Sequence, residues 1–273
     1  MKWRFLVSGK LSSAENMAID DAIFQCIQDG RSLPTIRFYD WEPSTISCGF
    51  NQEAAKEVDF IALDELGFGF VRRPTGGRVV LHDNEVTYAV ISPVAERLAG
   101  NVTASYSEIS KALAKGFELM GIKVDFEKGN LSSEHQRQVA NPCFTSSSRY
   151  ELSYKRKKIV GSAQVRKNSC LLQHGSILLN NDQSKLAQIL PGLSIAQKER
   201  MSNYLKRKTV SINQILSVPK KYYEVVELLK SGFKEKWSMD EFMNKNTLET
   251  YELKIANELR LTKYLTDEWN QKK

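Results

Sequence analysis

A helical pattern near the start of the chain gives way, at about residue 35, to a series of short β-rich segments. Ser12 and Glu15 have the spacing of a capping box, and the apolar residues that follow recur at helical intervals. The later segments are rich in β-branched and aromatic residues and are separated by prolines and by the pair Gly76–Gly77. They cover residues 35–39, 45–50, 68–72, 78–81 and 86–91. This order predicts a sheet with a helix packed on one face and with functional residues in its loops.

The rest of the chain continues this mixture of helices and strands. Ser105 and Glu108 predict a second capping box, which would open a helix that stops at Gly121. Further strands are expected at 122–126, 150–154, 159–165 and 170–179, a mobile polar loop at 127–141, and helices at 222–237 and 248–264. The predicted class is therefore α+β, with a main domain over residues 1–238 and a small helical unit over residues 239–273.

Composition argues against several classes of protein. The hydrophobic share of 41% and the charged share of 26% are close to the globular average, and no apolar run approaches the roughly 20 residues that span a bilayer. The apolar stretch near the N-terminus is too short for a signal peptide, so a cytoplasmic protein is expected. The net charge of +7 favours nucleic acid, anionic lipid or an acidic protein as a partner, although a basic surface without such a partner fits equally well.

The four cysteines lie far apart, at positions 26, 48, 143 and 170, and form no C-x-x-C pair. Such spacing argues against a zinc site and against a dense disulfide framework, and no metal site is predicted. Free thiols are expected instead.

The segment 72–83 combines two glycines with three arginines in a strand–turn–strand setting. Glycines let backbone N–H groups approach an anion or a thioester carbonyl, and guanidinium groups can hold phosphate. A plain Gly-Gly turn is the alternative. Neither the P-loop pattern nor a dinucleotide fingerprint is present. His82 and Asp83 are adjacent in a strand and should point to opposite faces, so His82 is predicted to shape the site by hydrogen bonding rather than to act with Asp83.

A candidate nucleophile is Cys143, at the end of the polar loop and shortly before the cations of residues 155–158. A nearby ammonium stabilises a thiolate over a thiol, which suits nucleophilic chemistry. A buried structural thiol, beside a solvated hairpin tip, is the alternative. The basic cluster lacks interleaved aromatic residues and is weak evidence for nucleic acid.

Several motifs, in order along the chain, resemble the biotin/lipoate protein ligase superfamily, specifically its octanoyltransferase branch in low-GC Gram-positive bacteria. They are residues 16–20, 36–41, 72–78 with 82–83, 172–178 and, at the tail, 263–264 with 267–270. The resemblance covers nearly the whole chain. It implies the ligase-like α+β fold, a mixed and largely antiparallel sheet flanked by helices, with a tunnel for an eight-carbon chain beside the Gly-Gly loop.

The resemblance also implies the site residues. Lys158, which precedes the Gly-Ser-Ala-Gln segment, would contact the acyl carboxyl, and Cys143 in its Cys-Phe context would carry the acyl thioester. Arg78 stands where typical lipoate ligases have a third glycine. The predicted acyl- and substrate-binding residues are Arg72, Arg73, Thr75, Gly76, Gly77, Arg78, His82, Gly161, Ser162, Ala163, Gln164, Gln173, His174 and Gly175.

The implied activity is a ping-pong octanoyl transfer in protein lipoylation, without metal or nucleotide. The donor would be octanoyl-acyl carrier protein, and the acceptor the target lysine of a lipoyl-domain protein such as glycine cleavage H protein. Neither nucleic acid nor membrane is expected as a partner. Two alternatives are an ATP-dependent lipoate ligase, which would need ATP and Mg²⁺, and a non-catalytic module that binds acyl groups or nucleic acid.

Two geometric expectations follow. Gly76 and Gly77 should lie within contact range of Lys158, because their backbone N–H groups would face the same acyl oxygen. Residues 173–175 should line the same cavity, since alternation puts Gln173 and Gly175 on one face of their strand.

Overall fold

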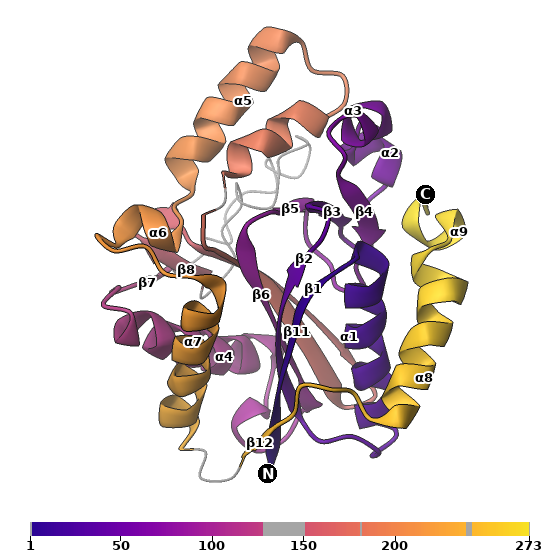
Figure 1. Cartoon of the computed structure of the whole chain (residues 1–273), viewed down its shortest axis with the longest axis vertical. Coiled ribbons are helices and arrows are strands. Elements are labelled where there is room, and N and C mark those ends of the chain that lie inside the picture. Colours follow the sequence, from indigo (N-terminus) through magenta and orange to yellow (C-terminus); the bar gives the residue numbers. More distant parts are fainter. Residues whose placement is uncertain (1, 128–150, 181, 239–241, 273) are drawn as a thin grey trace.

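A six-stranded mixed sheet forms the centre of the protein in a computed structural model that describes residues 2–127, 151–180, 182–238 and 242–272 (Figure 1). In spatial order its strands are β10 (Val160–Lys167), β11 (Cys170–Leu178), β6 (Glu85–Pro93), β2 (Thr35–Trp41), β1 (Trp3–Leu11) and β12 (Phe242–Asn244). β1 pairs in parallel with β2 and β12, and the other neighbours are antiparallel. The predicted α+β class with a largely antiparallel sheet is confirmed.

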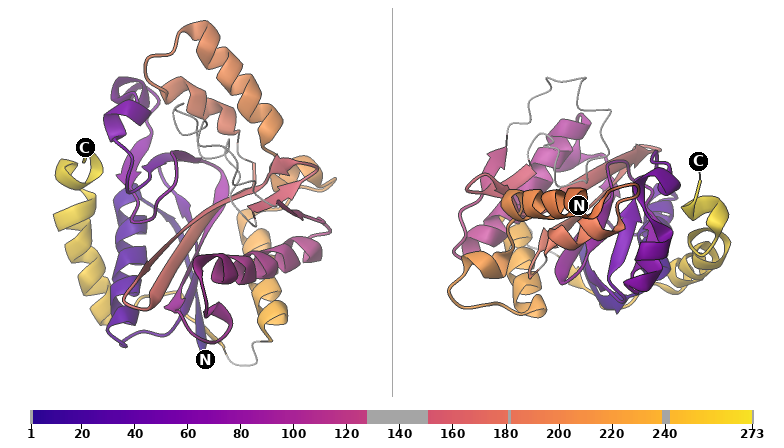
Figure 2. Two further views of the ribbon diagram at one scale, coloured as in Figure 1. Left: turned by 180° about the vertical axis from the view of Figure 1, so that it is seen from behind. Right: turned by 90° about the horizontal axis from the view of Figure 1, so that it is seen from above.

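Helices cover both faces of this sheet (Figures 1 and 2). α1 (Ser13–Gln28) packs on the face that presents Leu6, Tyr39 and Leu172, whereas α4 (Val102–Leu119) and α7 (Tyr222–Trp237) cover the face that presents Phe38 and Tyr88. Strand alternation separates these two sets, because successive side chains point to opposite faces. Burial of one such large apolar side chain contributes about 1.5–3 kcal/mol to folding.

α4 and α7 cross closely because each has a glycine at the contact. A Cβ atom on Gly232 would lie 2.6 Å from the Cα atom of Gly116, closer than real contacts allow. The crossing therefore depends on the missing side chains.

Two smaller sheets accompany the large one. The first consists of β4 (Gly69–Arg72), β3 (Thr45–Cys48) and β5 (Val80–His82), with β3 in the middle. Because β4 and β5 lie on either side of β3, the segment between them crosses over β3 and is not the turn of a simple hairpin. The second consists of β7 (Asp125–Glu127), β8 (Glu151–Tyr154) and β9 (Lys157–Lys158).

Short helices connect these strands. They are α2 (Ala54–Glu57), α3 (Phe60–Glu65), the 3₁₀ turn η1 (Glu96–Leu98), the 3₁₀ segment η4 (Gln183–Ile189), α5 (Ile195–Lys208) and α6 (Ile212–Ile215). α5 packs on η4 at the same end of the molecule as α2 and α3 (Figure 1).

Of the two predicted capping boxes, the first is confirmed and the second is wrong. The Ser12 hydroxyl accepts from the Glu15 N–H while the Glu15 carboxylate accepts from the Ser12 N–H. α4, by contrast, begins three residues before Ser105, and its N-cap is Asn101, whose side chain accepts from the Ala104 N–H at 2.9 Å. Ser105 lies inside the helix, where its hydroxyl contacts Gln164 on β10.

The last part of the chain packs against the first. It comprises β12, α8 (Thr250–Leu259), the π-helical turn η5 (Arg260–Tyr264) and α9 (Asp267–Asn270). Arg4 of β1 forms a buried ion pair of 2.7 Å with Glu252 of α8, and the Tyr264 hydroxyl donates to Asp21 of α1 at 2.9 Å. The helical prediction for 248–264 matches α8 and η5, whereas β1 and β12 were not predicted. The proposed boundary after residue 238 stays a prediction.

Candidate active site

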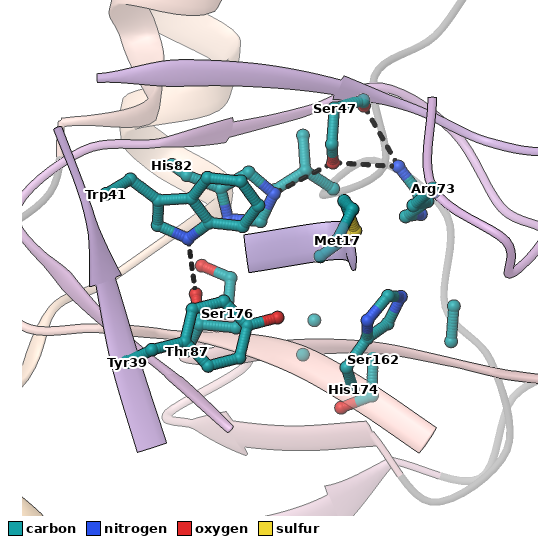
Figure 3. A pocket seen from close by; sticks show the side chains of 14 residues that line it. Met17, Tyr39, Trp41, Ser47, Arg73, His82, Thr87, Ser162, His174 and Ser176 are labelled. Atoms are coloured by element: carbon teal, nitrogen blue, oxygen red, sulfur yellow. Dashed lines mark hydrogen bonds between the residues drawn. The ribbon is translucent and has the colours of Figure 1, made fainter. Parts of the chain in front are cut away.

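A pocket lies between the α1 face of the large sheet and the small sheet of β3, β4 and β5 (Figure 3). Its empty volume is about 380 Å³ when the open mouth is included. Met17, Trp41 and Val80 provide apolar walls. Predicted site residues that line it are Arg73, His82, Gly161, Ser162, Ala163, His174 and Gly175.

Arg73 holds the Gly-Gly loop against this pocket. Its guanidinium is buried and donates to the main-chain carbonyls of Ser47, Gly76 and Arg78, at 2.6–2.9 Å. Position 77 requires glycine, because the φ of Gly77 is +93° and a Cβ atom there would lie 2.9 Å from the Arg73 guanidinium. The loop conformation is thus fixed by a charged side chain that binds the loop's own backbone.

Arg72, the neighbour of Arg73, binds the turn after β3 and the end of the chain. Its buried guanidinium donates to the carbonyls of Gly49, Phe50 and Gln52 and also to those of Trp269 and Lys272 near the end of the chain. These bonds give Arg72 a structural part, and its predicted contact with substrate stays a prediction.

His174 stands in a chain of hydrogen bonds that begins at a buried carboxylate. Its Nδ1 lies 3.2 Å from Asp20 Oδ2 and its Nε2 lies 2.7 Å from Thr75 Oγ1. Because the carboxylate can only accept, Nδ1 carries the proton and Nε2 accepts from Thr75. Burial lowers the pKa of His174 and the Asp20 carboxylate only partly opposes this, so the ring is neutral at pH 7.

Asp20 itself is held by two further donors. Arg37 Nη1 lies 2.7 Å from Oδ1, and the Tyr39 hydroxyl donates to Oδ2 at 2.8 Å. Burial alone would raise the pKa of Asp20, but the Arg37 charge and the bond from His174 outweigh it, and the pKa lies below the usual value. Asp20 therefore remains ionised and fixes the tautomer of His174.

A second chain of the same kind lies across the pocket (Figure 3). His82 Nδ1 lies 2.7 Å from Glu85 Oε1, and its Nε2 lies 2.8 Å from the Ser47 hydroxyl, which also accepts from Arg73. Trp41 stacks on the His82 ring with centroids 4.3 Å apart. The prediction that His82 shapes the site by hydrogen bonding agrees with these contacts, and Asp83 instead pairs with Lys185.

Residues 173–175 of β11 divide between the two faces of the sheet. His174 and Gly175 line the pocket, whereas Gln173 does not; its amide donates to the Tyr88 hydroxyl at 2.8 Å. Gly175 also approaches the Tyr88 ring, so the predicted alternation is confirmed. The prediction that Gln173 lines the same cavity is wrong, because its side chain lies on the face covered by α4 and α7. A Cβ atom on Gly175 would lie 2.5 Å from Ser162 Oγ, which explains why glycine fits here.

A second hollow lies on the other side of β10, beside the start of α4. It is lined by Gly76, Gly77 and Gln164 of the predicted set and also by Tyr106, with Ser162 and Ala163 shared between both hollows. The Gly-Gly loop therefore lies beside β10. Its contact with Lys158 stays a prediction.

Lys158 lies on β9, shortly before this part of β10. It is buried, and its Nζ forms an ion pair of 2.9 Å with Glu151 on β8. Cys143 lies outside the described residues, as does the rest of 128–150, so its predicted approach to Lys158 stays a prediction. The other cysteines, Cys26, Cys48 and Cys170, are free and buried.

Burial raises the pKa of all three described thiols, to about 11 for Cys48. They are therefore protonated at neutral pH and poor nucleophiles. This leaves Cys143 as the better candidate for thiolate chemistry.

Sequence reasoning missed the two carboxylates, Asp20 and Glu85, that orient the histidines, and Ser47. A signal existed for Asp20, because an acid that occupies the apolar stripe of a helix needs a buried partner. No comparable local signal marks Ser47.

Residues 12–234 match the lipoyl protein ligase A/B catalytic domain. The chain belongs to this family. Octanoyltransferase LipM from Brevibacillus brevis is 42% identical over 98% of both chains, and those from Kyrpidia tusciae and Bacillus subtilis are 41% and 39% identical over 98–99%. The predicted family is confirmed.

Solved structures of lipoate protein ligases share the fold. A bi-partite ligase from Thermoplasma acidophilum superposes with a TM-score of 0.81 at 22% identity, over 99% of this chain and 96% of that one. Lipoate-protein ligase A with bound ATP gives 0.79 at 23% identity over 99% of both. The ligase-like fold implied by the motifs is thereby confirmed for this member of the lipoyl protein ligase A/B family.

Proposed function

We propose that this protein is an octanoyltransferase of protein lipoylation. It would move the octanoyl group from the thioester of octanoyl-acyl carrier protein to the target lysine of a lipoyl-domain protein, such as glycine cleavage H protein. The observation that carries the proposal is the similarity to octanoyltransferases, about 40% identity along the whole chain. The transfer consumes no nucleotide and needs no metal ion, and we assign it to the cytoplasm.

The pocket supports an acyl ligand. Its walls include Met17, Trp41 and Val80 together with Gly161 and Gly175. Each buried methylene group contributes about 0.8 kcal/mol, so an eight-carbon chain gains several kcal/mol there. The neutral His174, with both ring nitrogens bonded to Asp20 and Thr75, brings no net charge to the cavity wall.

In the proposed mechanism the Cys143 thiolate attacks the thioester carbonyl, the carrier thiolate leaves and takes up a proton, and a thioester forms on Cys143. The lysine amine of the acceptor then attacks this thioester, loses a proton, and releases Cys143 as thiolate. Lys158 would lower the pKa of Cys143 and stabilise the developing oxyanion. Its ion pair with Glu151 restrains the ammonium group but also offsets part of its charge.

Intact-protein mass spectrometry after incubation with octanoyl-acyl carrier protein tests the proposal. We expect the mass of one added octanoyl group on the wild type and none on Cys143→Ser. Acceptor modification from free octanoate with ATP and Mg²⁺, together with full transfer by Cys143→Ser, would instead identify an ATP-dependent ligase. Absence of modification under either condition would favour a binding module.

A further inference from the structure

Two basic segments that are distant in the sequence meet beside Lys158. Residues 155–157, in the turn after β8 and at the start of β9, are Lys, Arg and Lys. Residues 206–208, in the last turn of α5, are also Lys, Arg and Lys. All six side chains are exposed. Lys158 and Thr209 are neighbours in a parallel bridge, and the Val210 N–H donates to the Lys158 carbonyl at 3.0 Å. We call these six residues the basic rim.

The backbone conformation of this turn indicates that its cations were not selected by local backbone preference. Lys155 and Arg156 have φ values of +48° and +65°, a region that favours Gly or Asn at the tip of a two-residue hairpin. Side chains with a long cationic tip therefore occupy positions where the backbone alone would select other residues. Residues 206–208 do stabilise the C-terminus of α5 through the helix dipole, but no helix ends at the turn.

The basic rim is poorly neutralised by the protein's own acids. Within the part of the chain that the structure describes, Lys206 has an ion pair with Asp182 at 4.0 Å, and none of the other five cations has one. Residues 154–160 and 200–209 contain no Asp or Glu. A cationic surface of this kind attracts an anionic partner and aligns it before contact.

We propose that the basic rim is the docking surface for the acidic protein that carries the acyl thioester. This inference rests on the proposed function, because it assumes that the acyl group arrives on a protein. An acidic carrier fits better than RNA or lipid, since the rim borders Lys158, where the thioester would react. Charges at the edge of an interface mainly set the association rate and its salt dependence.

Charge reversal with a matched control tests the rim. The double variant Arg156→Glu/Arg207→Glu removes one cation from each segment. Lys2→Glu/Lys254→Glu makes the same change in net charge at exposed positions on the N-terminal residues and α8, away from α5 (Figure 1). Transfer is measured with octanoyl-carrier protein and with octanoyl-pantetheine, a thioester without a protein.

We expect the rim variant to lose about tenfold or more in kcat/KM with octanoyl-carrier protein at low salt, and the loss to shrink as ionic strength rises. Its kcat/KM with octanoyl-pantetheine and both values of the control variant should match the wild type. An equal loss in both double variants, or an equal loss with octanoyl-pantetheine, would overturn the proposal.

Binding of the unacylated carrier protein, followed by fluorescence anisotropy, separates this inference from the proposed function. If the wild type is acylated by neither thioester, the proposed function fails, yet weaker carrier binding by the rim variant alone would still support the surface. If the rim variant binds the carrier as the wild type does and loses affinity only for tRNA or for anionic vesicles, the docking proposal is wrong.

Discussion

Substitution of Asp20 by Asn should destabilise the protein far more than the loss of an ordinary ion pair. Asp20 and Arg37 are both fully buried, 2.7 Å apart, and Asp20 also accepts from Tyr39 and faces His174. An Asn side chain would leave the Arg37 charge without a counterion and would turn an NH₂ group toward one of these donors.

The expected magnitude follows from this burial. Removal of one partner from a buried ion pair costs about 3–5 kcal/mol. For a chain of 273 residues, where about 1 kcal/mol shifts Tm by roughly 2–4 °C, the melting temperature should fall by about 6–20 °C.

Differential scanning calorimetry with a matched exposed pair provides the assay. Lys10 and Glu42 lie 2.9 Å apart with side chains 58% and 67% exposed, so Glu42→Gln should cost at most about 1 kcal/mol. If the melting temperature of Asp20→Asn falls no further than that of Glu42→Gln, Asp20 is not a buried counterion. The assignment of the His174 tautomer, which rests on an ionised Asp20, would then be wrong as well.

The pH dependence gives a second check on Asp20. Its pKa in the folded protein lies below the usual 3.8, because the Arg37 charge and the bond from His174 outweigh burial. The stabilisation that ionised Asp20 contributes is therefore fully present above about pH 4, and it is lost as the pH falls through the pKa of Asp20 in the folded protein. The difference in Tm between wild type and Asp20→Asn should stay constant from about pH 5 to 8 and narrow only in stronger acid.

Gly175→Ala should lower the free energy of unfolding by about 1–3 kcal/mol through overpacking. Gly76→Ala should leave it unchanged, because the space around the Cβ position of Gly76 is open. Equal urea midpoints for the two variants would contradict the crowding described for β11. Gly232→Ala should lower the urea midpoint although Ala favours helices by about 1 kcal/mol, since its Cβ would lie 2.6 Å from a backbone atom of α4; a higher midpoint would refute the close crossing. Lys158→Ala should shift iodoacetamide alkylation of Cys143, followed by peptide mass mapping, to higher pH; an unchanged pH profile would rule out the pairing.

Local patterns predicted much of the fold because their physical causes are local. The capping box of Ser12 and Glu15 involves neighbours within one turn, and alternation along β11 follows from strand geometry alone. The same pattern failed at Ser105, because a Ser and a Glu at this spacing also occur inside helices. There the hydroxyl bonds to Gln164, a partner 59 positions away that no local pattern reveals.

The segments that form the candidate site were predictable from the sequence, but the hydrogen bonds that orient its histidines were not. The motifs located the Gly-Gly loop, β10 and β11, and the structure brings them together. The orientation of His174 depends on Asp20, 154 positions earlier, and that of His82 on Glu85, whose acidic side chain gave no sign of burial in a strand. The pairing of His174 with Asp20 depends on the complete topology, which one sequence does not specify by pattern.

The bonds of Arg72 to the end of the chain have a consequence for the order of events during synthesis. The Trp269 carbonyl that accepts from Arg72 lies 197 positions later, a distance that a ribosome translates in about 10–40 s. Throughout that interval the Arg72 guanidinium lacks the carbonyls of Trp269 and Lys272, and only its bonds to the carbonyls of residues 49, 50 and 52 can form. The end of β4 is thus among the early parts of the chain to be made, yet it gains its last hydrogen-bond partners only after residues 269–272 have been made.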